Sequence, residues 1–351
     1  MERSPRSSVQ PRSAGIVPAD PAMALALARE GTLACERLAG DASDRAFFRI
    51  RFAEGGSPAT AILVRGVEAP FVETARLLRE VGVPAPEIYA EDEPEGLVVE
   101  EDFGDLLLEE AARPATPVGG RKGAGVADLY RDLVDGILAM QRHLPRRLKP
   151  DPGAPLALRR RFDAATFERE LRVFEEHLWR GHLGARPTEE ELSAFRGHAR
   201  TLAESVADLP LRFAHRDFHA RNLLVLPEGG FGLVDFQDAR FGPPHYDLAS
   251  LLFDGYVRLD PEFTEELFRR YEEASPSFAD REGARAAFER TALQRVLKAL
   301  GSFGYLARVK GKPHFLDYVS KSLGDAVHLL RARPELASLH ALLAAGHAAF
   351  A

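Results

Sequence analysis

The chain has 351 residues, of which 45% are hydrophobic and 28% charged, values typical of a globular protein with about two domains. Its formal net charge of -7, without a dominant basic stripe, argues against a general nucleic-acid binder. The one cysteine, Cys35, leaves no intramolecular disulfide and no cysteine-based metal site, and no run is apolar enough to span a membrane. We expect a cytoplasmic protein with no nucleic-acid, membrane or obligate protein partner.

The chain begins with scattered arginines among Ser and Pro, and we expect residues 1–20 to be a disordered tail. A short helix is predicted over 22–36. Residues 45–52 alternate apolar and basic side chains, with Phe48 and Ile50 on one face, which predicts a half-buried strand. A turn-rich segment then leads into a second strand at 61–65.

A second helix is predicted over 71–81, because its apolar side chains fall on one face and Gly82 follows them. Strands are predicted at 88–90 and 97–100. Residues 21–104 are therefore expected to form a small, strand-rich lobe.

The remaining residues, 105–351, are expected to form a larger helical lobe. Residues 112–125 are rich in Gly and Pro and are expected to form a surface loop that lacks the phosphate-binding P-loop pattern. Helical periodicity is found from residue 126 onward, in 164–180, 189–207, 262–274, 284–308 and 315–331, and in the Ala-rich C-terminal segment.

The segment His215-Arg216-Asp217-Phe218-His219-Ala220-Arg221-Asn222, followed by Val234-Asp235-Phe236, has the layout of a kinase active centre. In that layout Asp217 orients and deprotonates a hydroxyl. Asn222 and Asp235 hold Mg²⁺ against the phosphates of ATP. The sequence therefore predicts phosphoryl transfer.

Two short apolar runs, 223–226 and 231–234, flank Pro227-Glu228-Gly229-Gly230 and predict a β-hairpin. A turn centred on Glu228-Gly229 would make Asn222 and Asp235 cross-strand partners. A shift of the turn by one residue would still leave both at the open end of the hairpin. Two oxygen ligands would then converge, as a bound Mg²⁺ requires.

The order of elements resembles the α+β, two-lobed protein-kinase-like fold, in its aminoglycoside phosphotransferase branch. The resemblance implies that residues 21–104 are the nucleotide-binding lobe and that residues 105–351 carry the catalytic loop and the substrate site. Phe236 is followed by Gln237 and not by Gly, and the Gly-rich loop and the Ala-Pro-Glu motif of protein kinases are missing. A small hydroxylated substrate is therefore favoured over a protein.

Within that branch the chain is most similar to the N-acetylmuramate/N-acetylglucosamine anomeric kinases of bacterial cell-wall recycling. The resemblance implies transfer of the ATP γ-phosphate to the C1 hydroxyl of an amino sugar. The segments that carry it are Ala39 to Arg45, Glu101-Asp102-Phe103-Gly104, His215 to Asn222, Asp235 to Ala239, Gly242-Pro243, Tyr246-Asp247-Leu248, and Leu293-Gln294-Arg295 with Lys298.

The resemblance also suggests residues that bind the cofactor ATP. Ser43 and Arg45 flank the loop expected to cover the phosphates, although an ordinary turn would explain them equally well. The strand that normally carries an ATP-binding Lys ends in Arg65, which is either its substitute or a solvated residue. Glu73 is the candidate ion-pair partner on the next helix. The backbone around Glu101 and Asp102 is expected to meet adenine.

Three further residues are candidates for the substrate site. Asp238 is either a third acid or a turn residue. Arg295 and Lys298 lie three apart on a predicted helix and could meet an anionic substrate group, or could form a solvated basic face. By the same resemblance, His215 and Asp247 are expected to support the catalytic loop.

Other functions remain open at this stage. An aminoglycoside or choline-type kinase fits the same motifs. A metal hydrolase could use His215, Asp217 and His219 together with Asp235. A catalytically silent kinase-like binding module would explain the missing strand Lys.

Overall fold

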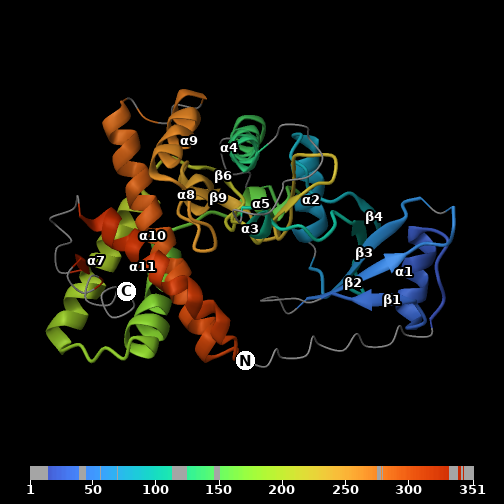
Figure 1. The fold of residues 1–351 in the computed structure, drawn as a ribbon, viewed down its shortest axis with the longest axis horizontal. Helices are drawn as coiled ribbons and strands as arrows, with labels where there is room; N and C mark the ends of the chain where they lie inside the picture. Colours follow the sequence, from blue (N-terminus) through green and yellow to red (C-terminus); the bar gives the residue numbers. More distant parts are fainter. Residues whose placement is uncertain are drawn as a thin grey trace. The chain divides into compact units, whose positions relative to one another are not determined.

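The computed structural model describes residues 15–38, 45–55, 57–68, 70–112, 125–145, 151–274, 278, 280–331, 339–340 and 343. The chain divides into two compact units (Figure 1). The first extends to Arg76 and includes Pro86–Phe103, and the second contains Leu77–Ala85 and the chain from Gly104 onward. Residues 77–85 therefore group with the second unit, which differs from the sequence-based division at 104 and 105. No helix among the described residues is long and apolar enough to cross a membrane.

The first unit is built on a five-stranded antiparallel sheet with the strand order β1-β2-β3-β5-β4. Four of its strands match predicted ones, and β1 does not. The strands are β1 (Cys35–Arg37), β2 (Ala46–Arg51), β3 (Thr60–Arg65), β4 (Ile88–Asp92) and β5 (Leu97–Glu101).

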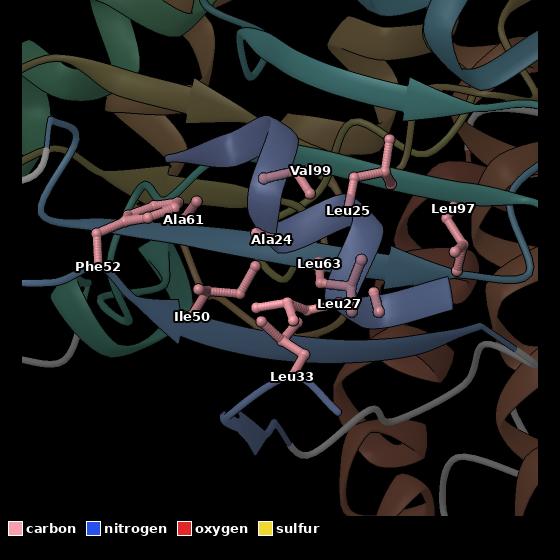
Figure 2. Close-up of a cluster of buried hydrophobic side chains, with 11 residues drawn as sticks. Ala24, Leu25, Leu27, Leu33, Ile50, Phe52, Ala61, Leu63, Leu97 and Val99 are labelled. Carbon is pink, nitrogen blue, oxygen red and sulfur yellow. The ribbon is translucent and has the colours of Figure 1, made fainter. Parts of the chain in front are cut away.

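Helix α1 (Pro21–Glu30) lies on one face of this sheet and closes its core, as Figure 2 shows. The alternation predicted for β2 is present, because Ile50 is fully buried on the face that meets α1. Each fully buried aliphatic side chain contributes about 1.5–3 kcal/mol through the removal of apolar surface from water. The core consists of Ala24, Leu25, Leu27, Ala28, Leu33, Ile50, Phe52, Ala61, Leu63, Leu97 and Val99.

The helix predicted over 22–36 is wrong in its second half. Asp20 caps the N-terminus of α1 by accepting a hydrogen bond from the Met23 N–H. Gly31 ends the helix in the left-handed conformation, with φ of 73°. The following residues, Cys35–Arg37, pair with β2 instead of continuing the helix.

Helix α2 (Pro70–Glu80) begins and ends within one residue of the prediction. Its buried side chains include Phe71, Ala75 and Leu78, which are the apolar face that the sequence indicated.

The second unit is mainly helical (Figure 1). Predicted helices are present in four of the expected ranges, with small changes at their ends. The helices are α3 (Leu108–Ala111), α4 (Val126–His143), α5 (Leu156–Arg159), α6 (Ala164–Val173), the π-helix η1 (Phe174–His182), α7 (Glu189–Ala207), α8 (Tyr246–Leu252), α9 (Pro261–Ala274), α10 (Arg281–Arg308), the 3-10 helix η2 (Pro313–Tyr318) and α11 (Val319–Leu330).

Several details of this unit differ from the expectation. The single helix predicted over 164–180 is α6 followed by the wider π-helix η1, and the last predicted helix begins as η2. The short α3, α5 and α8 were not predicted because they contain too few residues to show a period. Most of the loop 112–125 and most of the Ala-rich C-terminal segment lie outside the described residues.

Two small sheets in the second unit position the kinase-like motif. Strands β6 (Arg212–Ala214) and β9 (Arg240–Gly242) form one, and β7 (Leu223–Val225) and β8 (Phe231–Leu233) form the other. The predicted hairpin is therefore present, with Leu223 opposite Leu233. The catalytic loop, residues 215–222, is the connection between β6 and β7.

Candidate active site

Two buried aspartates hold the backbone of the catalytic loop at its two ends. The Asp247 carboxylate on α8 accepts hydrogen bonds from the His215 N–H, at 2.6 Å, and from the Arg216 N–H, at 3.0 Å. Asp254 accepts one from the Ala220 N–H at 2.7 Å. Charged acceptors make strong bonds to backbone amides in a buried setting, so this loop is rigidly supported. Asp247 was expected to act in this way, whereas Asp254 was not noticed in the sequence.

Two residues of the motif have backbone conformations that side-chain-bearing residues rarely adopt. The φ angles of Arg216 and Asp235 are 86° and 65°, and they are the non-glycine residues with positive φ in the described part of the chain. Such conformations cost about 1–3 kcal/mol each and collect at functional sites, where the surrounding structure holds them. The two strained residues, Arg216 and Asp235, precede Asp217 and follow Asn222 in the two segments of the predicted kinase-like motif.

The Asp217 carboxylate lies among cationic side chains. Lys298 Nζ on α10 is 2.6 Å from Asp217 Oδ1, and Arg295 Nη2 is 3.8 Å from the same oxygen. Burial raises the pKa of Asp217, but the positive charges of Lys298, Arg216 and Arg295 lower it by more than burial raises it. The resulting pKa is well below the usual range. The carboxylate therefore stays ionised, as the acceptor of a proton or a hydrogen bond must be.

Asn222 and Asp235 meet at the open end of the hairpin. By the observed register Asn222 is opposite Val234, whose N–H donates to the Asn222 carbonyl at 3.0 Å, so the turn is slightly earlier than expected. Asp235 follows directly, and its Oδ2 is 3.5 Å from Asn222 Nδ2. The two side chains therefore lie together, as the hairpin argument predicted, but the Asn222 amide nitrogen and not its oxygen faces Asp235.

The donor set at this point fits Mg²⁺. The Asn222 amide nitrogen donates to the Asp217 carbonyl at 2.9 Å, which directs its Oδ1 to the opposite side. Asp235 supplies a carboxylate next to the Asn222 side chain. Mg²⁺ in proteins takes one or two such oxygens and completes its shell with water and phosphate oxygens. Asn222 and Asp235 could hold a magnesium ion in that manner.

A hydrolytic metal site finds no support among the described residues, which contain no cluster of three or more His, Cys, Asp or Glu side chains placed to hold an ion. His215 Nε2 is 3.1 Å from the Val234 carbonyl, an acceptor that requires the ring to donate. Burial lowers the pKa of His215, and burial together with the charges of Lys298 and Arg295 lowers that of His219 to about 4. Both rings are neutral at neutral pH.

Arg295 and Lys298 share one face of α10, but they do not form a solvated basic surface. Arg295 is only 5% exposed; its Nε donates to Ser250 Oγ at 2.7 Å, and its guanidinium lies over the Tyr246 ring. Lys298 is committed to Asp217. The sequence suggested a substrate anion or a solvated basic face, and the partner in the structure is the Asp217 carboxylate.

Asp238 is at the centre of an ion-pair cluster. Its carboxylate pairs with Arg216 at 2.7 Å and Arg240 at 3.1 Å. Glu170 on α6 extends this cluster, because it is 3.6 Å from Arg216 and accepts a hydrogen bond from Gln294 Nε2 at 2.7 Å. Glu170 has no motif around it, so the sequence offered no signal for it.

The first unit holds the residues expected to bind the nucleotide. Arg65 Nη2 donates to the Ala28 carbonyl at 2.8 Å, at the C-terminal end of α1, and its guanidinium lies over the Phe48 ring. These contacts give Arg65 a structural partner inside the unit. Arg45 lies over the rings of Phe47 and Phe71. Ser43 lies outside the described residues.

The other candidates of this unit surround the end of β5. Asp102 pairs with Arg49 of β2 through two contacts of 2.7 and 2.9 Å. Glu101 accepts a hydrogen bond from the Glu87 N–H at 3.1 Å. Glu73 is in the first turn of α2 and lines a small cavity with Arg76. These contacts order the segment that follows β5.

A carboxylate on a braced loop, with an amide and a second carboxylate on the adjoining hairpin, defines a phosphotransferase centre of the protein-kinase-like class. Residues 34–287 match the model of the phosphotransferase enzyme family (APH), and the chain belongs to this family. It is 31% identical to the N-acetylmuramate/N-acetylglucosamine kinase of Pseudomonas aeruginosa, over 87% of this chain and 86% of that protein. It is 30% identical to the protein of that name from Caulobacter vibrioides, over 89% and 91%.

Solved structures agree on the fold. A choline/ethanolamine kinase family protein from Mesorhizobium loti aligns with a TM-score of 0.55 at 19% identity, over 89% of this chain and 92% of that one. The ADP-bound aminoglycoside phosphotransferase APH(2'')-Ib aligns with a TM-score of 0.54 at 14% identity, over 87% and 97%. The expected two-lobed kinase-like fold and the phosphotransferase class are confirmed.

Proposed function

We propose that this protein is an ATP-dependent kinase that phosphorylates the C1 hydroxyl of N-acetylmuramate or N-acetylglucosamine. The observation that carries the proposal is that Asp217, Asn222 and Asp235 lie together on one braced loop and the adjoining hairpin. Two carboxylates and an amide are the side chains that phosphoryl transfer requires. The amino-sugar acceptor is supported by relatives at about 30% identity that bear this name and align over most of the chain.

In this proposal Asp217 orients the attacking hydroxyl and accepts its proton. The low pKa of Asp217 makes it a weak base, which suits a loose transition state in which the proton leaves late. It also suits an anomeric hydroxyl, because a hemiacetal is more acidic than an ordinary alcohol. The weak basicity is therefore consistent with the proposed acceptor.

Lys298 is proposed as a positioning residue. Its Nζ occupies Asp217 Oδ1, so the other carboxylate oxygen is left to face the acceptor hydroxyl. Arg295 supports this arrangement, because its hydrogen bonds to Ser250 and Tyr246 hold its guanidinium near Asp217 and keep it from turning toward a substrate.

Asn222 and Asp235 are the proposed magnesium ligands. The ion, when bound, neutralises charge that develops on the phosphates during transfer. The chain contributes to this by holding Asp235 in a strained conformation beside Asn222.

The nucleotide is proposed to contact the first unit through Arg45 and the backbone at Glu101 and Asp102, with Glu73 in a supporting role. We do not assign Arg65 to a phosphate, because its guanidinium is already bound to the end of α1. The use of ATP and an amino sugar is consistent with a cytoplasmic enzyme.

The proposal is tested by an ATP-turnover screen over N-acetylmuramate, N-acetylglucosamine, an aminoglycoside and choline, with and without Mg²⁺. We expect turnover of the N-acetylated sugars only, and a product whose ¹³C and ³¹P NMR spectra locate the phosphate on C1. Turnover of choline or the aminoglycoside alone, or a phosphate on C6, would contradict it.

A further inference from the structure

An arginine-lined groove occupies a part of the second unit that the proposed reaction does not use. It encloses a volume of about 660 Å³ between the end of α6, the π-helix η1, the start of α7 and the end of α10. Five arginines line it against two glutamates, in a chain whose net charge is -7. The arginines are Arg172, Arg180, Arg186, Arg196 and Arg308.

The two glutamates compensate only part of this charge. Glu175 is buried and accepts from Arg196 at 2.8 and 2.9 Å and from Arg180 at 3.4 Å. Arg172 pairs with Glu168, which lies outside the groove, at 2.8 Å. Three of the arginines therefore have carboxylate partners.

The other two arginines, Arg186 and Arg308, carry charge that no carboxylate in the described residues meets. Arg186 Nη1 donates to the backbone carbonyls of Gly184 and Ala185, both at 3.1 Å, and these neutral acceptors hold it at the rim. Arg308, in the last turn of α10, forms no hydrogen bond or ion pair within the described parts of the chain.

Arg308 is exposed, and its side chain lies beside η1. Its guanidinium lies against Gly181, where an added Cβ would be 2.9 Å from Arg308 Cζ, so the glycine lets this side chain approach η1 closely. Gly181 belongs to η1, whose wider turns are shown by the bond from the Leu183 N–H to the Leu178 carbonyl at 2.8 Å. Isolated π-helical segments occur frequently at functional sites.

We propose that this groove binds a small molecule that carries a phosphate with at least two negative charges. Guanidinium groups match phosphate oxygens in a bidentate manner, and Arg186 and Arg308 are the groups with charge to offer. The volume is in the range of small-molecule sites, roughly 300–1,000 Å³. A sugar phosphate and a nucleotide share this chemistry, and both would fit. The proposal does not depend on the acceptor assigned above.

The chain provides its own probe of this groove. Trp179 is the single tryptophan of the sequence, and it lies in η1 next to Arg180. It is buried at 5% exposure and packs against Phe195 of α7. All tryptophan fluorescence of the chain therefore comes from η1, the helix that supplies Arg180 and Gly181 to the groove.

The test is a fluorescence titration of the full chain with pyrophosphate, without Mg²⁺, in 50 and 150 mM salt. We expect a saturable change that the Arg186→Gln and Arg308→Gln variants each weaken at least fivefold. Arg270→Gln is the matched control, since Arg270 is a surface arginine that pairs with Asp135 away from the groove, and it should leave the affinity unchanged.

Competition then separates the two sources of phosphate. N-acetylglucosamine 1-phosphate and ADP are each added to the pyrophosphate complex, and displacement by either one supports the groove and identifies its ligand class. An affinity for pyrophosphate that is equal in the wild type and in both groove variants would overturn the proposal. So would a fluorescence change that sulfate or chloride reproduces at the same concentration.

Discussion

Asp217 is the residue on which the proposed chemistry depends most directly. The Asp217→Asn variant keeps the size of the side chain but cannot accept a proton, so turnover should fall by roughly 10²–10⁴-fold. Nucleotide affinity should stay the same, because Asn222 and Asp235 are unchanged. Steady-state kinetics and calorimetry with an ATP analogue measure the two effects. Full activity in this variant would rule out the assigned role.

Lys298 sets both the orientation and the pKa of Asp217. In Lys298→Met the charge 2.6 Å from Asp217 Oδ1 is lost, so the pKa of Asp217 rises. Because the ionised carboxylate is the active form, the acidic limb of the kcat profile should move to higher pH. We expect kcat to fall by roughly 10- to 100-fold with little change in KM.

The Lys298→Arg variant is the control for this prediction, because it restores the positive charge. It should recover the position of the acidic limb even if kcat is only partly restored. An unchanged pH profile in Lys298→Met would mean that the lysine has a purely structural role.

At this scale the sequence was informative where a motif fixes the spacing. The residues from His215 to Asn222 and Asp235 could be identified because their order along the chain reflects their chemistry. Lys298 and Asp217 are in contact although they are 81 residues apart in the sequence. Asp254 accepts a hydrogen bond from Ala220, which is 34 residues away in the sequence. Such contacts depend on how helices pack, and no local pattern encodes them.

At the scale of elements, strand β5 contains an unusual buried acid. Glu100 is 5% exposed, and its Oε2 is buried without a hydrogen-bond partner among the described residues. Burial raises the pKa of Glu100 from the ordinary 4.5 to about 8. The folded state then binds more protons than the unfolded state between these values, so the free energy of unfolding decreases as the pH rises through this window.

The Glu100→Gln variant imitates the protonated acid and removes this dependence. We expect it to be more stable than the wild type by about 1–4 kcal/mol at pH 8, and equal to it near pH 4. Urea unfolding followed by circular dichroism at both values measures the difference. Glu91→Gln, on the exposed side of β4, should change stability by less than about 0.5 kcal/mol at either pH. If Glu100→Gln and the wild type had the same free energy of unfolding at pH 8, the prediction would be contradicted.

The elements themselves were predicted well where a period or a turn signal is strong. The alternation in β2, the stripe in α4 and the turn between β7 and β8 depend on local sequence and are present. The helix expected over 22–36 was wrong because Gly31 offers a left-handed end that the periodicity ignores. The π-helical part of η1 could not be foreseen, because its side chains continue the apolar pattern of α6.

At the scale of the whole molecule, each compact unit has its own buried core. Glu100 belongs to the first unit, whereas Trp179 belongs to the second. Domains with separate cores can unfold in separate transitions. Tryptophan fluorescence should therefore follow the second unit alone, while circular dichroism follows both.

Gly301 of α10 provides the perturbation that tests this separation. A Cβ there would lie 2.6 Å from the Phe174 backbone nitrogen at the start of η1, so Gly301→Ala forces the two helices apart. Overpacking of this kind costs about 1–3 kcal/mol. Gly197→Ala on α7, where nothing lies within 4 Å, should instead stabilise that helix by about 0.5–1 kcal/mol.

In urea, Gly301→Ala should lower the midpoint of the fluorescence transition and Gly197→Ala should raise it. Glu100→Gln at pH 8 should leave that midpoint in place while it shifts the remaining circular dichroism transition upward, because its stabilisation belongs to the other core. If all three variants moved both signals together, the two units would unfold as one cooperative body, and the stability of the five-stranded sheet could not be changed without also changing that of the second unit.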